Sequence, residues 1–304
     1  MTIRVAFAVA PAEVLGDDDT DRAAHDAAFA AAAIGLDHHV WSDPDAPWAD
    51  YDLVVVRSTW DYLEHEDEFR AWLGRMDALG TLHNPARVIA WNLDKRYLVD
   101  LAAEGVPVIP MDVCLDPTAV VEALVQVAGE VVVKPAVSAG SRLTGRFAHG
   151  DPAAETLALA ILAEGRPVLV QPAVRSVAKQ GEVSTLVFGG SISHSVRKGP
   201  LLDLGGGLVG GAYTETLEPE TLTPARRAVV EAASSAVGRL VEARFDVSEP
   251  LLYARIDVVT LDDGTEALLE VELAEPAFFL SAAPLGAGRF VAEVARRTGA
   301  APGH

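Results

Sequence analysis

The chain has 304 residues and a formal net charge of −20, and half of its residues are hydrophobic. This length allows two or three lobes, each around a sizeable core. The acidic charge argues against nucleic acid and anionic membrane as partners, since both are negatively charged themselves. No apolar run approaches the ~18 residues of a membrane span, and the first apolar stretch, residues 3–10, is too short for a signal peptide. We therefore expect a soluble, cytoplasmic protein, and the composition leaves room for a homo-oligomer.

The first 85 residues alternate between two patterns of apolar residues. Residues 3–9 and 52–57 are continuous apolar runs, typical of strands buried on both faces. Residues 21–36 form an Ala-rich helical stretch, and residues 66–79 place apolar side chains at helical spacing. The order strand, helix, strand, helix predicts a small parallel α/β lobe that ends near Asn84-Pro85.

From residue 91 onward, strands follow one another with fewer helices between them, which predicts antiparallel sheet. We expect a helix from Asn92 to Gly105, a short strand between Pro107 and Pro110, and a helix capped by Asp116. The remaining predicted strands are 130–137, 168–174, 182–188, 191–198 and a final pair, and the remaining helices are 153–164, 224–245 and 289–298. The fold class is therefore α/β in front and α+β behind.

The strongest chemical signal is a predicted hairpin over residues 251–275. Asp263-Gly264 suits a two-residue turn, which pairs Asp262 with Thr265. The same register places two further pairs opposite one another on one face, namely Asp257 with Glu270 and Arg255 with Glu272.

Two carboxylates that face each other in a sheet repel, and burial increases the cost. A hard divalent cation between Asp257 and Glu270 removes this conflict, and oxygen ligands suit Mg²⁺. The alternative is a solvated face with a cross-strand ion pair. A zinc site is not expected, because Cys114 is the only cysteine and the histidines show no HExxH spacing.

Lys134 ends an apolar strand and precedes a loop of small residues, 138–145. Free backbone N–H groups after a strand can cradle phosphate, although an ordinary turn has the same composition. Taken alone, Lys95 and Lys198 are typical of solvated lysines, and the glycine run 205–211 is typical of a flexible loop.

In the front lobe, Arg57 follows a buried strand, where ligands of parallel sheets gather. Its guanidinium could hold a substrate carboxylate or form an ion pair with Asp61. Trp60 and Tyr62 fit either a pocket wall or the core. His194 fits either proton transfer or a structural role.

Six short motifs then occur in a particular order. They are Asp94-Lys95, Val-Val-Lys134-Pro with its small-residue loop, Val-Leu-Val-Gln171-Pro, Gly181-Glu182, Ala-Arg255-Ile-Asp257 and Leu-Glu270-Val-Glu272. This order resembles the ATP-grasp ligases over residues 91–280. The resemblance implies an ATP-grasp fold with a pre-ATP-grasp substrate domain at 1–90 and an ATP-grasp region at 91–304. Within that region it implies a lid at about 108–172 and a C-terminal antiparallel-sheet catalytic domain at about 173–304.

The resemblance also implies ATP and two Mg²⁺ as cofactors. The implied catalytic residues are Lys95, Lys198 and Arg255, and the implied metal ligands are Asp257, Glu270 and Glu272. The implied nucleotide-binding residues are Lys95, Lys134, Ser138, Gly140, Ser141, Gln171, Pro172, Ala173, Val174 and Glu182. The substrate residues that we expect are Arg57, Ser58, Thr59, Trp60, Asp61 and His194. Glu272 is a departure, because the family usually has Asn at this position.

Further segments are similar to one branch of the family, the cycloserine synthetases of antibiotic biosynthesis, which close O-ureido-D-serine. They include residues 57–62, 193–200 and 273–280. The implied reaction is phosphorylation of a substrate carboxylate, followed by attack of the substrate's own amine on the acyl phosphate. Two alternatives stay open: an amide or peptide ligase that joins an amino acid to a separate amine, and a non-catalytic nucleotide-binding relative. A dinucleotide-binding oxidoreductase is excluded, because no GxGxxG turn follows the first strand.

Overall fold

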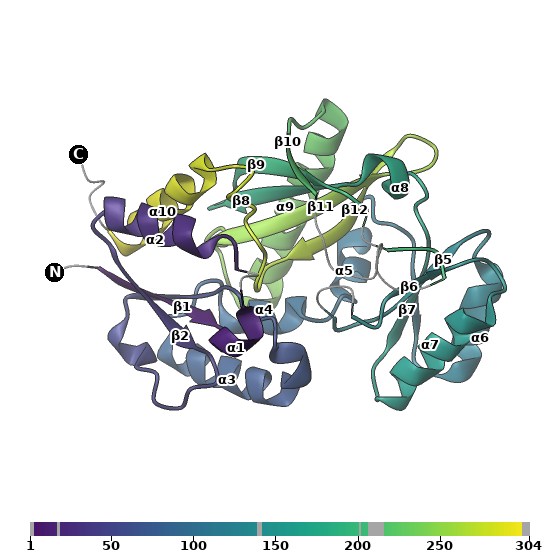
Figure 1. Ribbon diagram of the computed structural model, residues 1–304, viewed down its shortest axis with the longest axis horizontal. Helices are drawn as coiled ribbons and strands as arrows, with labels where there is room; N and C mark the ends of the chain where they lie inside the picture. The colour runs from purple at the N-terminus through teal and green to yellow at the C-terminus, as the bar shows by residue number, and fades with distance from the viewer. Residues whose placement is uncertain (1–2, 17–18, 139–141, 201, 206–215, 300–304) are drawn as a thin grey trace.

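The computed structural model describes residues 3–16, 19–138, 142–200, 202–205 and 216–299, which form three β-sheets surrounded by helices (Figure 1). The strands are β1 Arg4–Val9, β2 Gly35–Val40, β3 Leu53–Val56, β4 Asp112–Cys114, β5 Val131–Pro135, β6 Gly145–Phe147, β7 Val168–Pro172, β8 Glu182–Phe188, β9 Ser191–Lys198, β10 Leu217–Glu220, β11 Tyr253–Thr260 and β12 Glu266–Glu272. The helices are α1 Ala12–Leu15, α2 Arg22–Ala31, α3 Glu66–Leu79, α4 Ala86–Asn92, α5 Tyr97–Ala103, α6 Pro117–Gln126, α7 Pro152–Ala163, α8 Val177–Gln180, α9 Pro224–Phe245 and α10 Leu285–Thr298, and the 3₁₀ turns are η1 Trp48–Asp50 and η2 Tyr62–Glu64. Among these described residues, no helix has the length and apolar character that a membrane crossing needs.

The first sheet is parallel, with strand order β2-β1-β3, and confirms the predicted α/β lobe. Because successive side chains of β1 point to opposite faces, the strand contributes to two cores. On one face, Phe7 packs with Phe29 of α2 and with Phe290 of α10. On the other face, β1 and β3 share a core with the aromatic side chains of α3. Helix α10 therefore packs against α2 of the front lobe and against β8 and β9 of the third sheet (Figure 1).

The predicted helix at 21–36 is too long, because α2 ends at Ala31 and β2 follows at Gly35–Val40. The chain turns at Ala33, whose φ of 55° lies outside the helical region. β2 is an edge strand and only half-buried, so its side chains mix polar and apolar types. Such a strand carries neither the continuous apolar run nor the strict alternation that marks other strands.

The second sheet is antiparallel, with strand order β4-β7-β5-β6, and α6 and α7 pack on it. The predicted cap of α6 is confirmed, since the carboxylate of Asp116 accepts hydrogen bonds from Thr118 N and Ala119 N. The strand predicted between Pro107 and Pro110 is wrong, because Val108 forms only an isolated bridge to Leu268. β4 begins two residues beyond Pro110 instead.

The third sheet is antiparallel, with strand order β10-β9-β8-β11-β12, and α9 packs against β11 and β12. The predicted pairs Arg255 with Glu272 and Asp257 with Glu270 are confirmed. The predicted two-residue turn is wrong, because Leu261 N donates to Thr265 O and closes a longer loop. A register shift after Asp257 compensates for the extra loop residue, so the error at the turn does not reach the functional end of the hairpin.

The helix predicted from Asn92 to Gly105 is interrupted. Asn92 ends α4, a helix that the sequence analysis missed, and α5 starts at Tyr97. The Asn92 side chain bonds Val271 O at 2.8 Å and Leu273 N at 2.7 Å, and the Tyr97 hydroxyl bonds both backbone polar groups of Val271. These two side chains satisfy the outer edge of β12 in place of another strand. They also fix Lys95, which lies between α4 and α5, beside β12.

The three sheets fall within the proposed domain ranges. Strands β1–β3 lie within residues 1–90, β4–β7 within 108–172 and β8–β12 within 173–304. We keep this division as a proposal. One core cluster crosses it, because Phe7 and Phe29 of the front lobe pack with Phe278 and Phe290. The helix predicted at 289–298 also begins earlier, at Leu285.

Candidate active site

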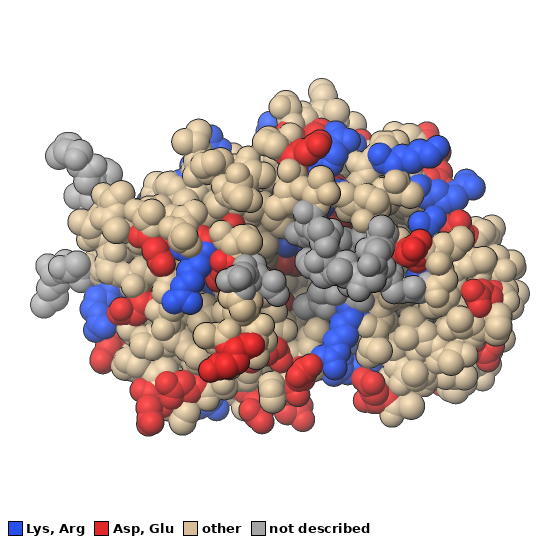
Figure 2. Space-filling model, viewed as in Figure 1, with Lys and Arg blue, Asp and Glu red and all other residues tan. Residues whose placement is uncertain are grey.

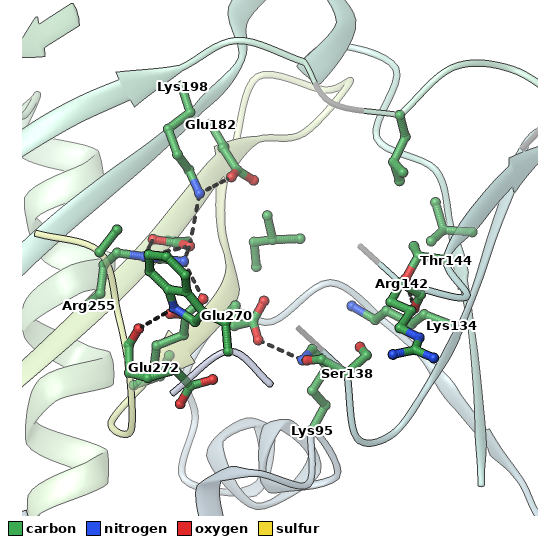
Figure 3. A pocket seen from close by; sticks show the side chains of 18 of the residues that line it. Lys95, Lys134, Ser138, Arg142, Thr144, Glu182, Lys198, Arg255, Glu270 and Glu272 are labelled. Carbon is green, nitrogen blue, oxygen red and sulfur yellow. Dashed lines mark hydrogen bonds and ion pairs between the residues drawn. The ribbon is translucent and has the colours of Figure 1, made fainter. Parts of the chain in front are cut away.

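A cavity of about 830 Å³ lies where residues of the second and third sheets meet η2 of the front lobe. It is the place where the predicted nucleotide, metal and catalytic residues come together (Figure 3). Figure 2 shows acidic side chains along the lower edge of the front lobe, in keeping with the net charge. The cavity, in contrast, is lined by Lys95, Lys134, Lys198 and Arg255. Carboxylates line it as well, so buried charges of both signs meet at this site.

Lys95 is held between the second sheet and β12. Its backbone N–H donates to Ala136 O at 2.8 Å, and its ammonium lies 2.6 Å from Ser138 O and 2.9 Å from Glu270 Oε1. Burial alone would lower the pKa of Lys95, but the charge of Glu270 outweighs this effect and raises the pKa above its usual value. Lys95 therefore carries its charge into the cavity, as Figure 3 shows.

Lys134 lies near the end of β5 and lines the cavity together with Arg142 and Thr144 (Figure 3). It is 7% exposed, and no carboxylate in the described part of the chain forms an ion pair with it. Burial lowers the pKa of Lys134 to about 8, with the charge of Glu270 acting against this shift. An anionic ligand in the cavity would supply the counter-charge that the protein does not provide.

Lys198 and Glu182 come together because of Gly181. With φ at 67°, Gly181 lies against the carbonyl group of Lys198, and a side chain there would collide with that carbonyl. The close approach lets β8 begin beside the end of β9. Lys198 then forms an ion pair with Glu182, and its Nζ lies 3.5 Å from Asp257 Oδ2.

Arg255 bridges the two strands of the hairpin. Its Nε lies 3.0 Å from Asp257 Oδ1, and its guanidinium also forms an ion pair with Glu272. Burial would raise the pKa of Asp257, but the charges of Arg255 and Lys198 lower it to about 2. Glu272, which shares Arg255 with Asp257, has its pKa raised to about 8 by burial. The carboxylate at the usual Asn position thus has a raised pKa, whereas that of its neighbour Asp257 is lowered.

The metal prediction was made for Asp257, Glu270 and Glu272. Among the described residues, no group of three or more His, Cys, Asp or Glu side chains is arranged around a point that could hold a metal ion. Each of the three carboxylates instead faces a lysine or arginine. All three line the cavity, and Asp257 and Glu270 occupy paired positions on neighbouring strands. The donor set is therefore chemically suited to Mg²⁺, whose ligands are oxygens.

The other predicted nucleotide residues divide into three groups. Ser138, Gln171, Ala173, Val174 and Glu182 line the cavity. Pro172 lies between two of them but does not line it. Gly140 and Ser141 lie outside the described residues, as does most of the glycine run 205–211.

Several predicted substrate residues lie outside the cavity and have structural partners. Arg57 donates to Pro276 O at 2.8 Å, lies 3.8 Å from Asp21 and covers the ring of Phe278. It forms no ion pair with Asp61, so that prediction is wrong. Arg57 does not line the cavity, and its guanidinium holds the loop that contains Pro276.

Three more of these residues likewise lack contact with the cavity. Ser58 donates to Asp19 at 2.5 Å, Thr59 is fully buried, and His194 Nε2 donates to Phe278 O at 2.7 Å. Both ring nitrogens of His194 thus have partners within the protein, which favours a structural role. Trp60 and Asp61 do line the cavity, and Asp61 accepts a hydrogen bond from Trp41 at 2.8 Å.

The sequence analysis missed the residue that organises loop 275–280. The carboxylate of Asp21 accepts hydrogen bonds from Phe278 N, Phe279 N and Leu280 N at 2.6, 3.2 and 2.7 Å. These bonds hold Phe279 at a φ of 56°, a left-handed conformation that is unusual for a bulky residue. The Phe279 ring lies 5.4 Å from Arg255 and 5.6 Å from Lys198. Only contacts more than 250 residues apart reveal this role, so no local pattern indicates it.

Comparisons with known proteins agree with this geometry. Residues 5–84 match the family model described as D-cycloserine synthetase DcsG, N-terminal domain. The cycloserine biosynthesis protein DcsG of Streptomyces lavendulae is 35% identical over 278 residues, which are 88% of this chain and 91% of the relative. The crystal structure of D-cycloserine synthetase DcsG has a TM-score of 0.88 and 32% identity, and the match covers 97% of this chain and 99% of that chain.

More distant structures share the fold alone. D-alanine–D-alanine ligase from Bacillus anthracis has a TM-score of 0.68 at 13% identity, with 98% of this chain and 97% of that chain covered. The fold and the cavity thus define an ATP-grasp enzyme, an ATP-dependent ligase. Within that class, the chain belongs to the D-cycloserine synthetase (DcsG) family.

Proposed function

We propose that this chain closes O-ureido-D-serine to D-cycloserine in an ATP- and Mg²⁺-dependent reaction that passes through an acyl phosphate. One observation carries the proposal. A cavity that gathers Lys95, Lys134, Lys198 and Arg255 lies in a chain that is 35% identical, over 88% of its length, to a cycloserine biosynthesis protein. The substrate is a small, amino-acid-like molecule.

Phosphoryl transfer asks a protein for positioning and for positive charge around the phosphate oxygens. Lys95 and Lys134, which both line the cavity, would hold the phosphates of ATP. Arg255 and Lys198, braced by Phe279, would face the transferred phosphoryl group. The chain around Gln171–Val174, at the end of β7, would frame the adenine. Asp257, Glu270 and Glu272 would hold Mg²⁺, which supplies further positive charge to the phosphate oxygens.

The substrate carboxylate accepts the phosphoryl group. The ring of D-cycloserine joins the carboxyl carbon to the nitrogen that is bonded to oxygen, so this nitrogen is the nucleophile. Its attack forms the C–N bond and breaks the bond between the carboxyl carbon and the phosphate oxygen, so that phosphate leaves. Water then hydrolyses the carbamoyl group: its oxygen bonds to the carbamoyl carbon, the bond from that carbon to the ring nitrogen breaks, the nitrogen takes up a proton, and the carbamate that leaves breaks down to CO₂ and NH₃. The α-amine stays free. Enclosure of the acyl phosphate in the cavity would protect it from water.

The test is ADP release with Mg·ATP and O-ureido-D-serine, with mass spectrometry of the products and a control that lacks the amino acid. ADP together with D-cycloserine supports the proposal. ADP that forms only when a separate amine is added identifies an amide ligase and overturns the cyclisation. Tight ATP binding without ADP release from a broad panel of amino acids indicates a non-catalytic relative.

A further inference from the structure

The carboxylates of the cavity are not all neutralised in the same way. Five of them pair with a lysine or arginine: Glu64, Glu182, Asp257, Glu270 and Glu272. Glu275 also lines the cavity and is 9% exposed. In the described chain no lysine or arginine forms an ion pair with it. Its side chain accepts a hydrogen bond from the neutral hydroxyl of Tyr62 instead.

The backbone around Glu275 is fixed on both sides. Trp60 Nε1 donates to Glu275 O at 3.3 Å, and Arg57 donates to Pro276 O at 2.8 Å. Tyr62 itself is 2% exposed. The backbone of Glu275 is therefore held in place where the front lobe meets the cavity.

Burial of a carboxylate without a cation is costly. The shift at Glu275 reflects this cost, since burial raises its pKa to about 7 although Lys95 and Tyr62 act in the opposite direction. Lys95 is already engaged with Glu270 at 2.9 Å. A ligand that brings its own positive charge would complete the site.

We infer that Glu275 binds the α-ammonium group of the amino-acid substrate. The inference rests on the proposed function, in which the substrate keeps a free α-amine. Glu275 follows the metal strand β12 by three residues, so an ammonium bound there leaves the substrate carboxylate free to point toward Arg255 and Lys198. Glu275 would thus select α-amino acids and orient the carboxylate for phosphorylation.

Asp61 is the other buried carboxylate of the cavity without a lysine or arginine partner, and it is the less suitable candidate. One of its oxygens accepts the indole N–H of Trp41 at 2.8 Å. It lies in the front lobe, directly before η2. The charges of both Lys95 and Glu270 act on the carboxyl group of Glu275, in contrast, so Glu275 lies close to the proposed reaction centre.

The test compares two enzymes and two substrates. Glu275→Gln keeps the size of the side chain and removes its charge, and 3-(ureidooxy)propanoate is O-ureido-D-serine without the α-amine. We expect Glu275→Gln to raise KM for O-ureido-D-serine about 10- to 100-fold, as the loss of a charged hydrogen bond would. The amine-free analogue should react poorly, and equally so, with both enzymes. An equal loss on both substrates, or an unchanged KM, would overturn the inference.

The wild-type enzyme gives a second measurement that does not depend on the variant's folding. It must use the amine-free analogue at least ~10-fold less efficiently than O-ureido-D-serine, and equal efficiency rejects the role of Glu275. Glu68→Gln, an exposed change in α3, is the matched control and should leave both values unchanged. If the wild-type enzyme releases no ADP with O-ureido-D-serine, the proposed function has failed. In that case, the wild-type enzyme and Glu275→Gln are compared on the α-amino acid that does support ADP release and on its amine-free analogue. This comparison then tests whether Glu275 binds the α-ammonium group.

Discussion

The ammonium group of Lys95 lies 2.9 Å from Oε1 of Glu270, and this pair joins the connection between α4 and α5 to strand β12. The same ammonium lies 2.6 Å from Ser138 O, at the point where the small-residue loop begins. One side chain thus links the strand proposed to bind metal with the loop proposed to bind phosphate. Substitutions at either partner change the charge balance of the whole cavity.

Glu270→Gln should reduce ADP release at least ~100-fold, because it removes a carboxylate that is proposed to hold Mg²⁺. Gln still offers an acceptor to Lys95, so the free energy of unfolding should fall by only about 1–2 kcal/mol. Steady-state ADP release and urea unfolding measure the two effects separately. Glu270→Asp keeps the charge and should retain part of the activity. Full activity in Glu270→Gln would remove this residue from the metal site.

Asp21→Ala should lower the free energy of unfolding by about 2–4 kcal/mol, because three buried backbone N–H groups lose their acceptor. Phe279 would lose its support, so kcat should fall although Asp21 does not line the cavity. Asp21→Asn keeps one acceptor oxygen and should cost about half as much. The control is Asp52→Ala, where a single exposed bond to Arg4 N is lost. Urea unfolding that fails to separate Asp21→Ala from the control contradicts this account of loop 275–280.

The exposed ion pair between Arg142 and Glu64, at 2.7 Å, joins the second sheet's side of the cavity to η2 of the front lobe. Exposed pairs contribute about 0–1 kcal/mol, so neither single reversal should change the melting temperature appreciably. Arg142→Glu should weaken ATP binding a few-fold, because like charges then face each other across the cavity mouth. The double reversal with Glu64→Arg should restore it. Calorimetric titration at low salt measures the ATP affinity of each variant. If the effects of the two single reversals on this affinity simply add in the double variant, the ion pair has no role in ATP binding.

His25 should make the protein less stable at acidic pH. Burial, aided by the charges of Arg57 and His38, lowers the pKa of His25 well below 6.5. Below pH 6.5 the unfolded chain therefore binds a proton that the folded chain does not, and the free energy of unfolding falls by up to ~1.4 kcal/mol per pH unit. His25→Phe fits among the surrounding rings and should flatten the curve of melting temperature between pH 5 and 6.5.

Burial also lowers the pKa values of His83 and His194. The melting temperature of His25→Phe should therefore still fall somewhat with decreasing pH. The exposed His149 provides the control, and His149→Ala should leave the curve as it is in the wild type. An unchanged slope in His25→Phe would show that other groups control acid stability.

Local patterns predicted much of this fold. The long helix Pro224–Phe245, the helix Glu66–Leu79 and the strands Glu182–Phe188 and Ser191–Lys198 have the predicted bounds. Each has strong periodicity or a clear cap. The half-buried β2 and the three-residue β4 and β6 do not, because too few of their side chains are buried to set a pattern.

The candidate site was likewise predictable only in part. The sequence order of Lys95, Lys134, Arg255 and Asp257 sufficed to bring these residues into one cavity. The roles of Arg57 and His194 did not follow from sequence, since both side chains bind loop 275–280, which lies more than 80 residues away in the chain. A charged side chain at a strand end serves a ligand or a neighbouring backbone equally well, and only the three-dimensional arrangement distinguishes the two.

The position of α10 has a consequence for the order in which the molecule assembles. The phenylalanines of β1 and α2 emerge early from the ribosome, but Phe278 and Phe290, which complete their core, are made last. The nascent front lobe therefore exposes an aromatic surface throughout synthesis. Truncation before α10 would leave that surface permanently open, so the first lobe should depend on the end of the chain for its own maturation.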